Sequence, residues 1–162
     1  MPGRDVDIHI TGGEHLERIV KALLEVGDGG LARELKSELR KAARPMVPKV
    51  RAAIMQQIPS QHDGSLRRAM AAATRSQFRA AGTQAGITIK VDGSKMPDGK
   101  KALPSYMEGR KRPWKHPVYG NRNVWVRQAD HQYFFKTVEP MGADVKKNMD
   151  AIAQRIAKKL EG

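Results

Sequence analysis

The sequence predicts an α+β fold in which N-terminal helices and a long C-terminal helix pack on a small antiparallel sheet, with a long basic loop. Apolar residues recur at helical spacing near both ends of the chain and alternate at strand spacing in the middle, whereas residues 92–123 show almost no periodicity. A chain of 162 residues is long enough for one domain with a core, so we expect a single domain over 1–162.

A strand and a helix are expected first. Over Asp5–Thr11, Val6, Ile8 and Ile10 alternate with polar residues, which is typical of a half-buried strand. A helix follows from about Glu14 to Val26. Its apolar stripe consists of Leu16, Ile19, Val20, Leu23 and Leu24.

The next helix is predicted from Leu31 onwards and carries an interruption. Its stripe at spacings of three or four is Leu35, Leu39, Ala42, Met46, Val50 and Ile54. Pro45 and Pro48 fall inside this pattern, and each removes a backbone donor and clashes with the preceding turn. Because the stripe keeps its phase, we expect a kink or a short interruption near Arg44.

The middle of the chain changes to strand spacing. Residues 65–73 are expected to form a short helix or to begin a strand, and residues 74–80 and 85–91 to form a hairpin with one solvated face. Residues 92–123, rich in Gly, Pro, Lys and Arg, are expected to form an extended basic loop, and such long loops are usually functional. A short strand is expected over residues 124–127.

The last part of the chain returns to helical spacing. Tyr133, Phe134 and Phe135 are expected to anchor a helix from Val138 to Leu160, with Pro140 in its first turn. The apolar stripe of this helix is Met141, Val145, Met149, Ile152, Ile156 and Leu160.

The charge balance indicates a polyanionic partner. Thirty Lys and Arg face 17 Asp and Glu, which gives a net charge of +13 and a pI near 10.3. A membrane partner is not expected, because no stretch approaches the roughly 18 apolar residues of a spanning helix. The chain has no Cys, so disulfides and thiolate metal sites are excluded. Residues 1–5 lack the layout of a signal peptide, and we expect synthesis in a cytoplasm.

The sequence gives little sign of catalysis, and we expect no enzyme, cofactor or metal site. The five histidines show no metal-binding spacing, and no serine lies in a nucleophile elbow. One alternative stays open, in which His116 and His131 act as acid–base groups with Asp130. In a small basic ribonuclease of the toxin type, Arg110 and Arg122 would join these two histidines.

The basic residues of the middle of the chain are the candidate functional residues. Cations interleaved with aromatic side chains suit contact with nucleic acid, but they also suit a solvated face or a loop held against acidic neighbouring subunits. No motif for reading base sequence is present. The candidates for a subunit interface or a DNA channel are Arg67, Arg68, Lys100, Lys101, Arg110, Lys111, Arg112, Trp114, Lys115, Tyr119 and Arg122.

Several strings, in this order of elements, resemble a known family. They are L-A-R-E-L-K-S-E-L-R-K-A-A-R-P-M-V-P-K-V-R at 31–51, G-S-L-R-R-A at 64–69 and K-H-P-V-Y-G-N-R-N-V-W-V-R-Q at 115–128, followed by the aromatic residues 133–135. This pattern resembles the minor tail, or tail-completion, family of lambdoid and related siphophages, in the version carried by actinobacterial phages. The family's Tyr-x-x-x-Val-Glu-x-Gly string is matched only loosely, at 105–109.

The resemblance implies a structural protein of the virion neck, assembled in the host cytoplasm. Its members are small α+β subunits that form a ring, sixfold by family analogy, between the head-side connector and the tail tube. The implied partners are further copies of the chain, connector or stopper proteins, tail terminator or tail tube proteins, and DNA passing through the ring. A tail terminator ring and, from other classes, a ribonuclease toxin or a nucleoid-type DNA-binding protein are the alternatives.

Overall fold

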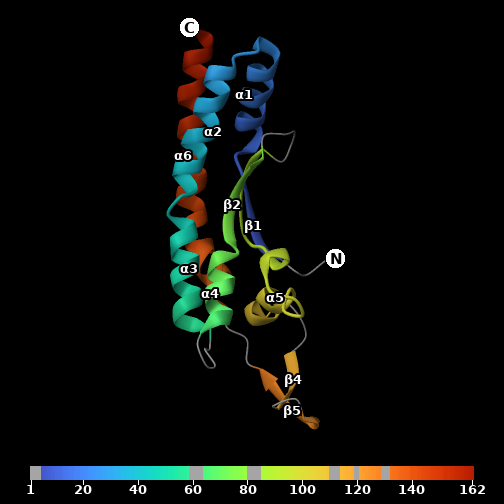
Figure 1. Cartoon of the computed structure of the whole chain (residues 1–162). Coiled ribbons are helices and arrows are strands. Elements are labelled where there is room, and N and C mark those ends of the chain that lie inside the picture. Colours follow the sequence, from blue (N-terminus) through green and yellow to red (C-terminus); the bar gives the residue numbers. More distant parts are fainter. Residues whose placement is uncertain (1–4, 59–63, 80–84, 110–113, 119–120, 129–131) are drawn as a thin grey trace. The chain divides into compact units, whose positions relative to one another are not determined.

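The computed structural model describes residues 5–58, 64–79, 85–109, 114–118, 121–128 and 132–162. The fold class is the predicted one: the chain is α+β, and a long C-terminal helix, α6 (Phe135–Glu161), packs on a small antiparallel sheet (Figure 1). The sheet has the strand order β1–β3–β2, with β1 at Val6–Thr11, β2 at Thr74–Arg79 and β3 at Gly86–Val91.

The remaining elements follow the chain in a simple order. Helix α1 is followed by α2, α3 and α4 before the β2–β3 hairpin, and a 3-10 turn η2, a helix α5 and a second hairpin β4–β5 precede α6. Their bounds are α1 Gly13–Val26, α2 Gly29–Ala43, α3 Met46–Gln57, α4 Ser65–Ala72, η2 Gly93–Lys95, α5 Leu103–Glu108, β4 Trp114–Val118 and β5 Asn121–Gln128. No helix in the described ranges is long and apolar enough to cross a membrane.

Two compact units are distinguished by their internal contacts. Unit 1 comprises Met1–Val6, Val50–Arg75 and Lys90–Thr137, and unit 2 comprises Asp7–Lys49, Ser76–Ile89 and Val138–Gly162. The expectation of a single domain over 1–162 stays a prediction.

A glycine allows β1 and β3 to lie close together. A Cβ on Gly86 would lie 2.1 Å from the carbonyl oxygen of Ile10, so only glycine allows the two backbones to approach in this way. The Gly12 amide donates to the Ala85 carbonyl at 3.1 Å, just beyond the ends of the strands. In β3 itself, Ile87 and Ile89 are at most 1% exposed, as the alternating pattern predicts for a sheet with one covered face.

The interruption expected near Arg44 is confirmed. Helix α2 ends at Ala43, and α3 begins at Met46 with Pro45 between them. The stripe keeps its phase across the break, as expected, although Ala43 rather than Ala42 is its buried alanine. The residues of the stripe that are at most 2% exposed are Leu35, Leu39, Met46, Val50 and Ile54.

The predicted start of the last helix was wrong. Helix α6 begins at Phe135 instead of Val138, so Pro140 lies inside the helix and not in its first turn. The cause is a distant cap: the Glu108 carboxylate accepts hydrogen bonds from the Phe134 and Phe135 amides, at 2.9 and 3.0 Å. These amides have no carbonyl partner within the helix, so the carboxylate stabilises the additional turn.

Residues 92–123 do not form the single extended loop that was expected. Their described part contains η2, α5 and β4, and β5 begins at Asn121. Helix α5 is short and forms through tertiary contacts: Leu103 and Met107 are buried, and the Tyr133 hydroxyl donates to the Pro104 carbonyl at 3.1 Å.

The β4–β5 hairpin is antiparallel and bulged. Trp114 pairs with Gln128 and Pro117 with Trp125, whereas Val118 pairs with Asn121. Residues 122–124 therefore lie between the partners of two consecutive β4 residues, which makes a bulge in β5. The strand expected over 124–127 thus extends over the whole of β5.

Candidate functional site

The first two predicted site residues, Arg67 and Arg68, lie on α4, and only one of them is exposed. Arg67 is half-buried, and its Nη1 donates to the Met55 carbonyl in the last turn of α3 at 2.9 Å. In the other direction, Arg51 of α3 donates to the carbonyls of Ala71 and Thr74, at 3.0 and 2.9 Å, where α4 ends. Each helix therefore supplies an arginine to the C-terminal carbonyls of the other, where a cation is favourable. Arg67 has a role within the fold, and Arg68 is exposed beside it.

The next predicted pair, Lys100 and Lys101, lies in the turn before α5. Lys100 is exposed, while the ammonium group of Lys101 lies 3.7 Å from the Asp98 carboxylate. Because the Asp98 side chain is fully exposed, this ion pair contributes little to stability and leaves both lysines accessible to a partner.

The other predicted candidates belong to the hairpin and its flanks. The backbone of Trp114 and Lys115 lies in β4, and that of Arg122 lies in the bulge of β5. Arg110, Lys111, Arg112 and Tyr119 lie outside the described residues. The candidates that are described come from α4, the turn before α5 and the hairpin, all of them within unit 1.

The acid–base alternative falls largely outside the described part of the chain. His116 lies in β4, whereas Asp130 and His131 are not among the described residues. Within the described ranges, no three His, Asp or Glu side chains gather in a way that could hold a metal ion.

A cluster of charges around the buried Asp92 carboxylate joins the ends of strands in unit 1. Asp92, 3% exposed, accepts hydrogen bonds from the Ser94 amide at 3.0 Å and the Ser94 hydroxyl at 2.6 Å. Arg75 of β2 lies 2.5 Å from the Asp92 carboxylate, and Lys90 of β3 lies 3.9 Å from it. Burial alone would raise the pKa of the Asp92 carboxyl, but the Ser94 hydrogen bonds and the two cations hold this pKa below its usual value.

Asp5 completes this cluster from the residue before β1. Its Oδ1 accepts the Gly93 amide at 2.8 Å, and its Oδ2 lies 3.7 Å from the Lys90 ammonium group. The two carboxylates and two cations thus bind the beginning of β1 and β2 to the end of β3. All four charges have partners within the fold, which makes the cluster structural.

A second buried carboxylate, Glu108, is 3% exposed and holds the junction of α5 and α6. Each of its oxygens accepts one backbone amide, as described above. Burial raises the pKa of the neighbouring Tyr133 hydroxyl, and the charge of Glu108 raises it further. The hydroxyl therefore remains a hydrogen-bond donor to the Pro104 carbonyl at all ordinary pH values.

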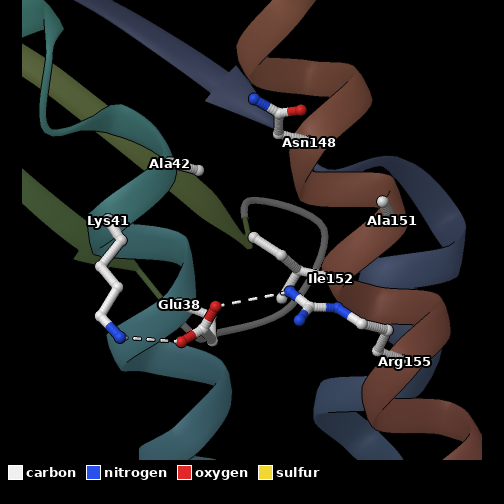
Figure 2. A pocket seen from close by; sticks show the side chains of 7 residues that line it. All are labelled: Glu38, Lys41, Ala42, Asn148, Ala151, Ile152 and Arg155. Atoms are coloured by element: carbon white, nitrogen blue, oxygen red, sulfur yellow. Dashed lines mark hydrogen bonds and ion pairs between the residues drawn. The ribbon is translucent and has the colours of Figure 1, made fainter.

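An open groove lies between α2 and α6 in unit 2 (Figure 2). It has a volume of about 370 Å³ and is lined by Glu38, Lys41, Ala42, Asn148, Ala151, Ile152 and Arg155. The Glu38 carboxylate lies between two cations, with Lys41 at 3.0 Å and Arg155 at 3.4 Å. The hydrogen bond from Lys41, then its charge, and then Arg155 lower the pKa of Glu38. The one carboxylate of the groove is thus paired with two cations, and one turn away Lys159 pairs with Glu34.

A different face of α2 was missed by the sequence analysis. Arg33, Lys36, Arg40 and Arg44 are all exposed, and none of them forms an ion pair with another described residue. We call these four residues the cationic face of α2. Their spacing of three or four is visible in the sequence as a second stripe beside the apolar stripe of this helix.

Comparison with known proteins gives no assignment: no family model, curated protein or solved structure matches the chain.

Proposed function

We propose that the chain is a non-enzymatic structural subunit of a siphophage head–tail junction. Copies form a ring, of six subunits by analogy with the family it resembles, that completes the tail and joins it to the head connector around the DNA channel. The partners are other copies of the chain, connector or stopper proteins, and tail terminator or tail tube proteins.

The distribution of charge is the observation that carries this proposal. Many of the acidic side chains are already engaged within the fold, by cations, amides or hydroxyls. Among them are Asp5, Asp28, Glu34, Glu38, Asp92, Asp98, Glu108 and Asp150. With a net charge of +13, the remaining surface is strongly cationic and suited to acidic neighbours or to nucleic acid.

Exposed apolar residues at the end of α1 give further support. Leu24 is 76% exposed and Val26 is 65% exposed, next to the turn that leads to α2. A neighbouring subunit that covers this corner would bury apolar area and add to the stability of both chains.

The sequence resemblance supplies the location. The strings that carry it fall on α2 and α3, on α4, and on the β4–β5 hairpin that precedes α6. The string at 31–51 falls on helices and the final helix follows the hairpin, as the resemblance leads us to expect, whereas the string at 115–128 forms a hairpin where a loop was expected.

Particles made without this protein test the proposal. We expect filled heads next to free tails of normal length in electron micrographs, since both parts would assemble but not join. Tails of uncontrolled, excessive length would instead identify the tail terminator. Normally joined particles would contradict both roles.

A matched complementation separates a structural role from catalysis. Wild-type protein and a His116→Ala/His131→Ala variant are supplied separately to the defective particles. Equal restoration of joined particles is expected, since the proposed role needs no acid–base group. Restoration by the wild type alone, with the variant equally abundant and folded, would support the ribonuclease alternative.

A further inference from the structure

We propose that the cationic face of α2 is a sequence-independent binding site for the phosphate backbone of duplex DNA. Arg33, Lys36, Arg40 and Arg44 are the contacting residues, and none of them belongs to the basic middle of the chain from which the sequence candidates were drawn.

The four side chains form one continuous stripe. With about 100° of rotation per residue, they fall within an arc of about 80° on α2. At about 1.5 Å per residue, Arg33 and Arg44 lie roughly 16 Å apart along the helix axis. Arg44 caps the helix in right-handed helical conformation, so the stripe keeps its direction to the last cation.

Without a bound anion, repulsion between the four cations lowers the stability of α2. Arg33 and Lys36 are three residues apart, and Arg40 lies four residues from both Lys36 and Arg44, so each step brings like charges together and destabilises the helix. The helix dipole favours cations in the last turn, where Arg40 lies, but it gives no benefit to Arg33 and Lys36. An anionic partner would remove this repulsion.

The acidic residues of α2 cannot neutralise the stripe. Glu34 pairs with Lys159, and Glu38 with Lys41 and Arg155, so both carboxylates serve contacts on another side of the helix. Helix α2 therefore has one side, facing α6, on which both carboxylates are paired with cations, and one side with four cations and no described acidic partner.

A phosphate backbone suits this face better than an acidic protein surface. The residues on the stripe are Arg and Lys, without an aromatic or large aliphatic side chain among them, whereas the centre of a protein interface is usually apolar and poor in charge. Binding to duplex DNA without sequence preference needs only cations that replace condensed counterions. Three of the four residues are arginines, whose guanidinium groups can bind phosphate through two hydrogen bonds.

The inference deepens the proposed function, because it names the surface that would touch DNA within a ring. It is tested on the isolated full-length chain, whereas the proposed function is tested in particles. A chain that joins heads to tails without binding DNA, or one that binds DNA without joining them, would separate the two.

The test is the salt dependence of binding to a short fluorescent DNA duplex of mixed sequence, followed by anisotropy. We expect the wild type to bind with a Kd of about 10⁻⁴–10⁻⁶ M at physiological salt. In the variant Arg33→Gln/Lys36→Gln/Arg40→Gln/Arg44→Gln, the slope of log K against log salt should fall by about 3–4, since each lost phosphate contact removes about 0.9. Glutamine keeps a good helix propensity, so the change is chiefly one of charge.

The matched control removes the same number of charges elsewhere in unit 2. Lys21→Gln/Lys146→Gln/Lys147→Gln/Lys158→Gln changes four exposed lysines of α1 and α6. The slope of log K against log salt for this control should fall by less than about 0.9, the value expected for one lost phosphate contact. Equal losses in both variants would show that net charge alone drives binding and would overturn the proposal, as would a wild type that does not bind the duplex.

A single-substitution variant and a second anionic probe test the proposal further. If the fourfold variant does not fold, Arg40→Gln alone should lower the slope by about 0.9, and an unchanged slope overturns the proposal. Polyglutamate serves as the acidic polypeptide probe. Binding to it that is tighter than binding to the duplex, and that is lost in the α2 variant, would mean that the face binds an acidic protein instead of DNA.

Discussion

Glu108 in unit 1 and Glu38 in unit 2 each accept two hydrogen bonds through their two carboxylate oxygens, yet their surroundings differ. Glu108 is 3% exposed and receives backbone amides, whereas the Glu38 side chain is 28% exposed and receives the ends of two flexible cations. The Phe134 amide is buried away from water at this contact, whereas the exposed ends of Lys41 and Arg155 can form hydrogen bonds with water instead. The same chemical group therefore determines stability in one place and balances surface charge in the other.

The difference shows that the carboxylates of the two units have different roles. Buried carboxylates of unit 1 fix the ends of strands and the start of α6. The half-buried carboxylates of Glu34 and Glu38 in unit 2 pair with cations on the α6 side of α2 and leave the cationic face of α2 without a described partner. Stability and interaction thus depend on separate residues, and mutations can address them one at a time.

The largest effect is expected at Glu108. Glu108→Ala should lower the free energy of unfolding by about 2–4 kcal/mol, because one buried amide and one part-buried amide lose their charged acceptor. Glu108→Gln should lower it less, since one carbonyl oxygen remains. Urea denaturation followed by circular dichroism measures both, with Glu139→Ala on the exposed surface of α6 as control. A Glu108→Ala variant as stable as this control would contradict a stabilising role for the buried Glu108 carboxylate.

A smaller effect is expected at Asp92. Asp92→Asn should lower the free energy of unfolding by about 1–3 kcal/mol at neutral pH, because Arg75 and Lys90 lose their buried anion while the Ser94 contacts are only partly kept. The matched control is Asp98→Asn, whose carboxylate is fully exposed and should be replaceable without loss.

The pH dependence gives Asp92 a second test. Its pKa is lower in the folded chain than in the unfolded chain, so its contribution is complete above an unfolded pKa of about 3.9 and is lost as the pH falls through the folded pKa. The wild type should therefore lose more stability than Asp92→Asn when denaturation is repeated at pH values below about 4. Parallel curves for the two proteins would contradict the proposed environment of Asp92.

The smallest effect is expected at Glu38. Glu38→Gln should leave the urea midpoint unchanged within experimental error, because its partners are exposed and remain solvated. Glu34→Gln should behave in the same way, and adding salt should change neither result. A loss comparable to that of Glu108→Ala would show that the α2–α6 pairs contribute to stability as the buried carboxylates do.

Much of the regular structure of the chain could be predicted from the sequence. The alternation of Ile87 and Ile89 identified β3, and Pro45 identified the break between α2 and α3. The start of α6 could not be predicted, because its cap comes from Glu108, 26 residues before the first amide that it accepts. Helix α5 was missed for a related reason: six residues give no periodicity, and its stability comes from burial against Tyr133.

The candidate site was harder to predict than the fold. Counting cations selected Arg67, but its guanidinium group is bound to the end of α3, and no local pattern shows that a cation is engaged in this way. The cationic face of α2 could have been found by examining its charges with the helical period that was applied to its apolar residues. Which cations remain unpaired became apparent only when Glu34 and Glu38 were seen to face α6.

The position of this chain in assembled particles, determined by cryo-electron microscopy, tests the central proposal most directly. We expect a closed ring of copies between the head connector and the tail tube, with the cationic face of α2 toward the DNA. Particles whose junction contains no density for this chain, together with a soluble protein whose RNA turnover depends on His116 and His131, would contradict the account.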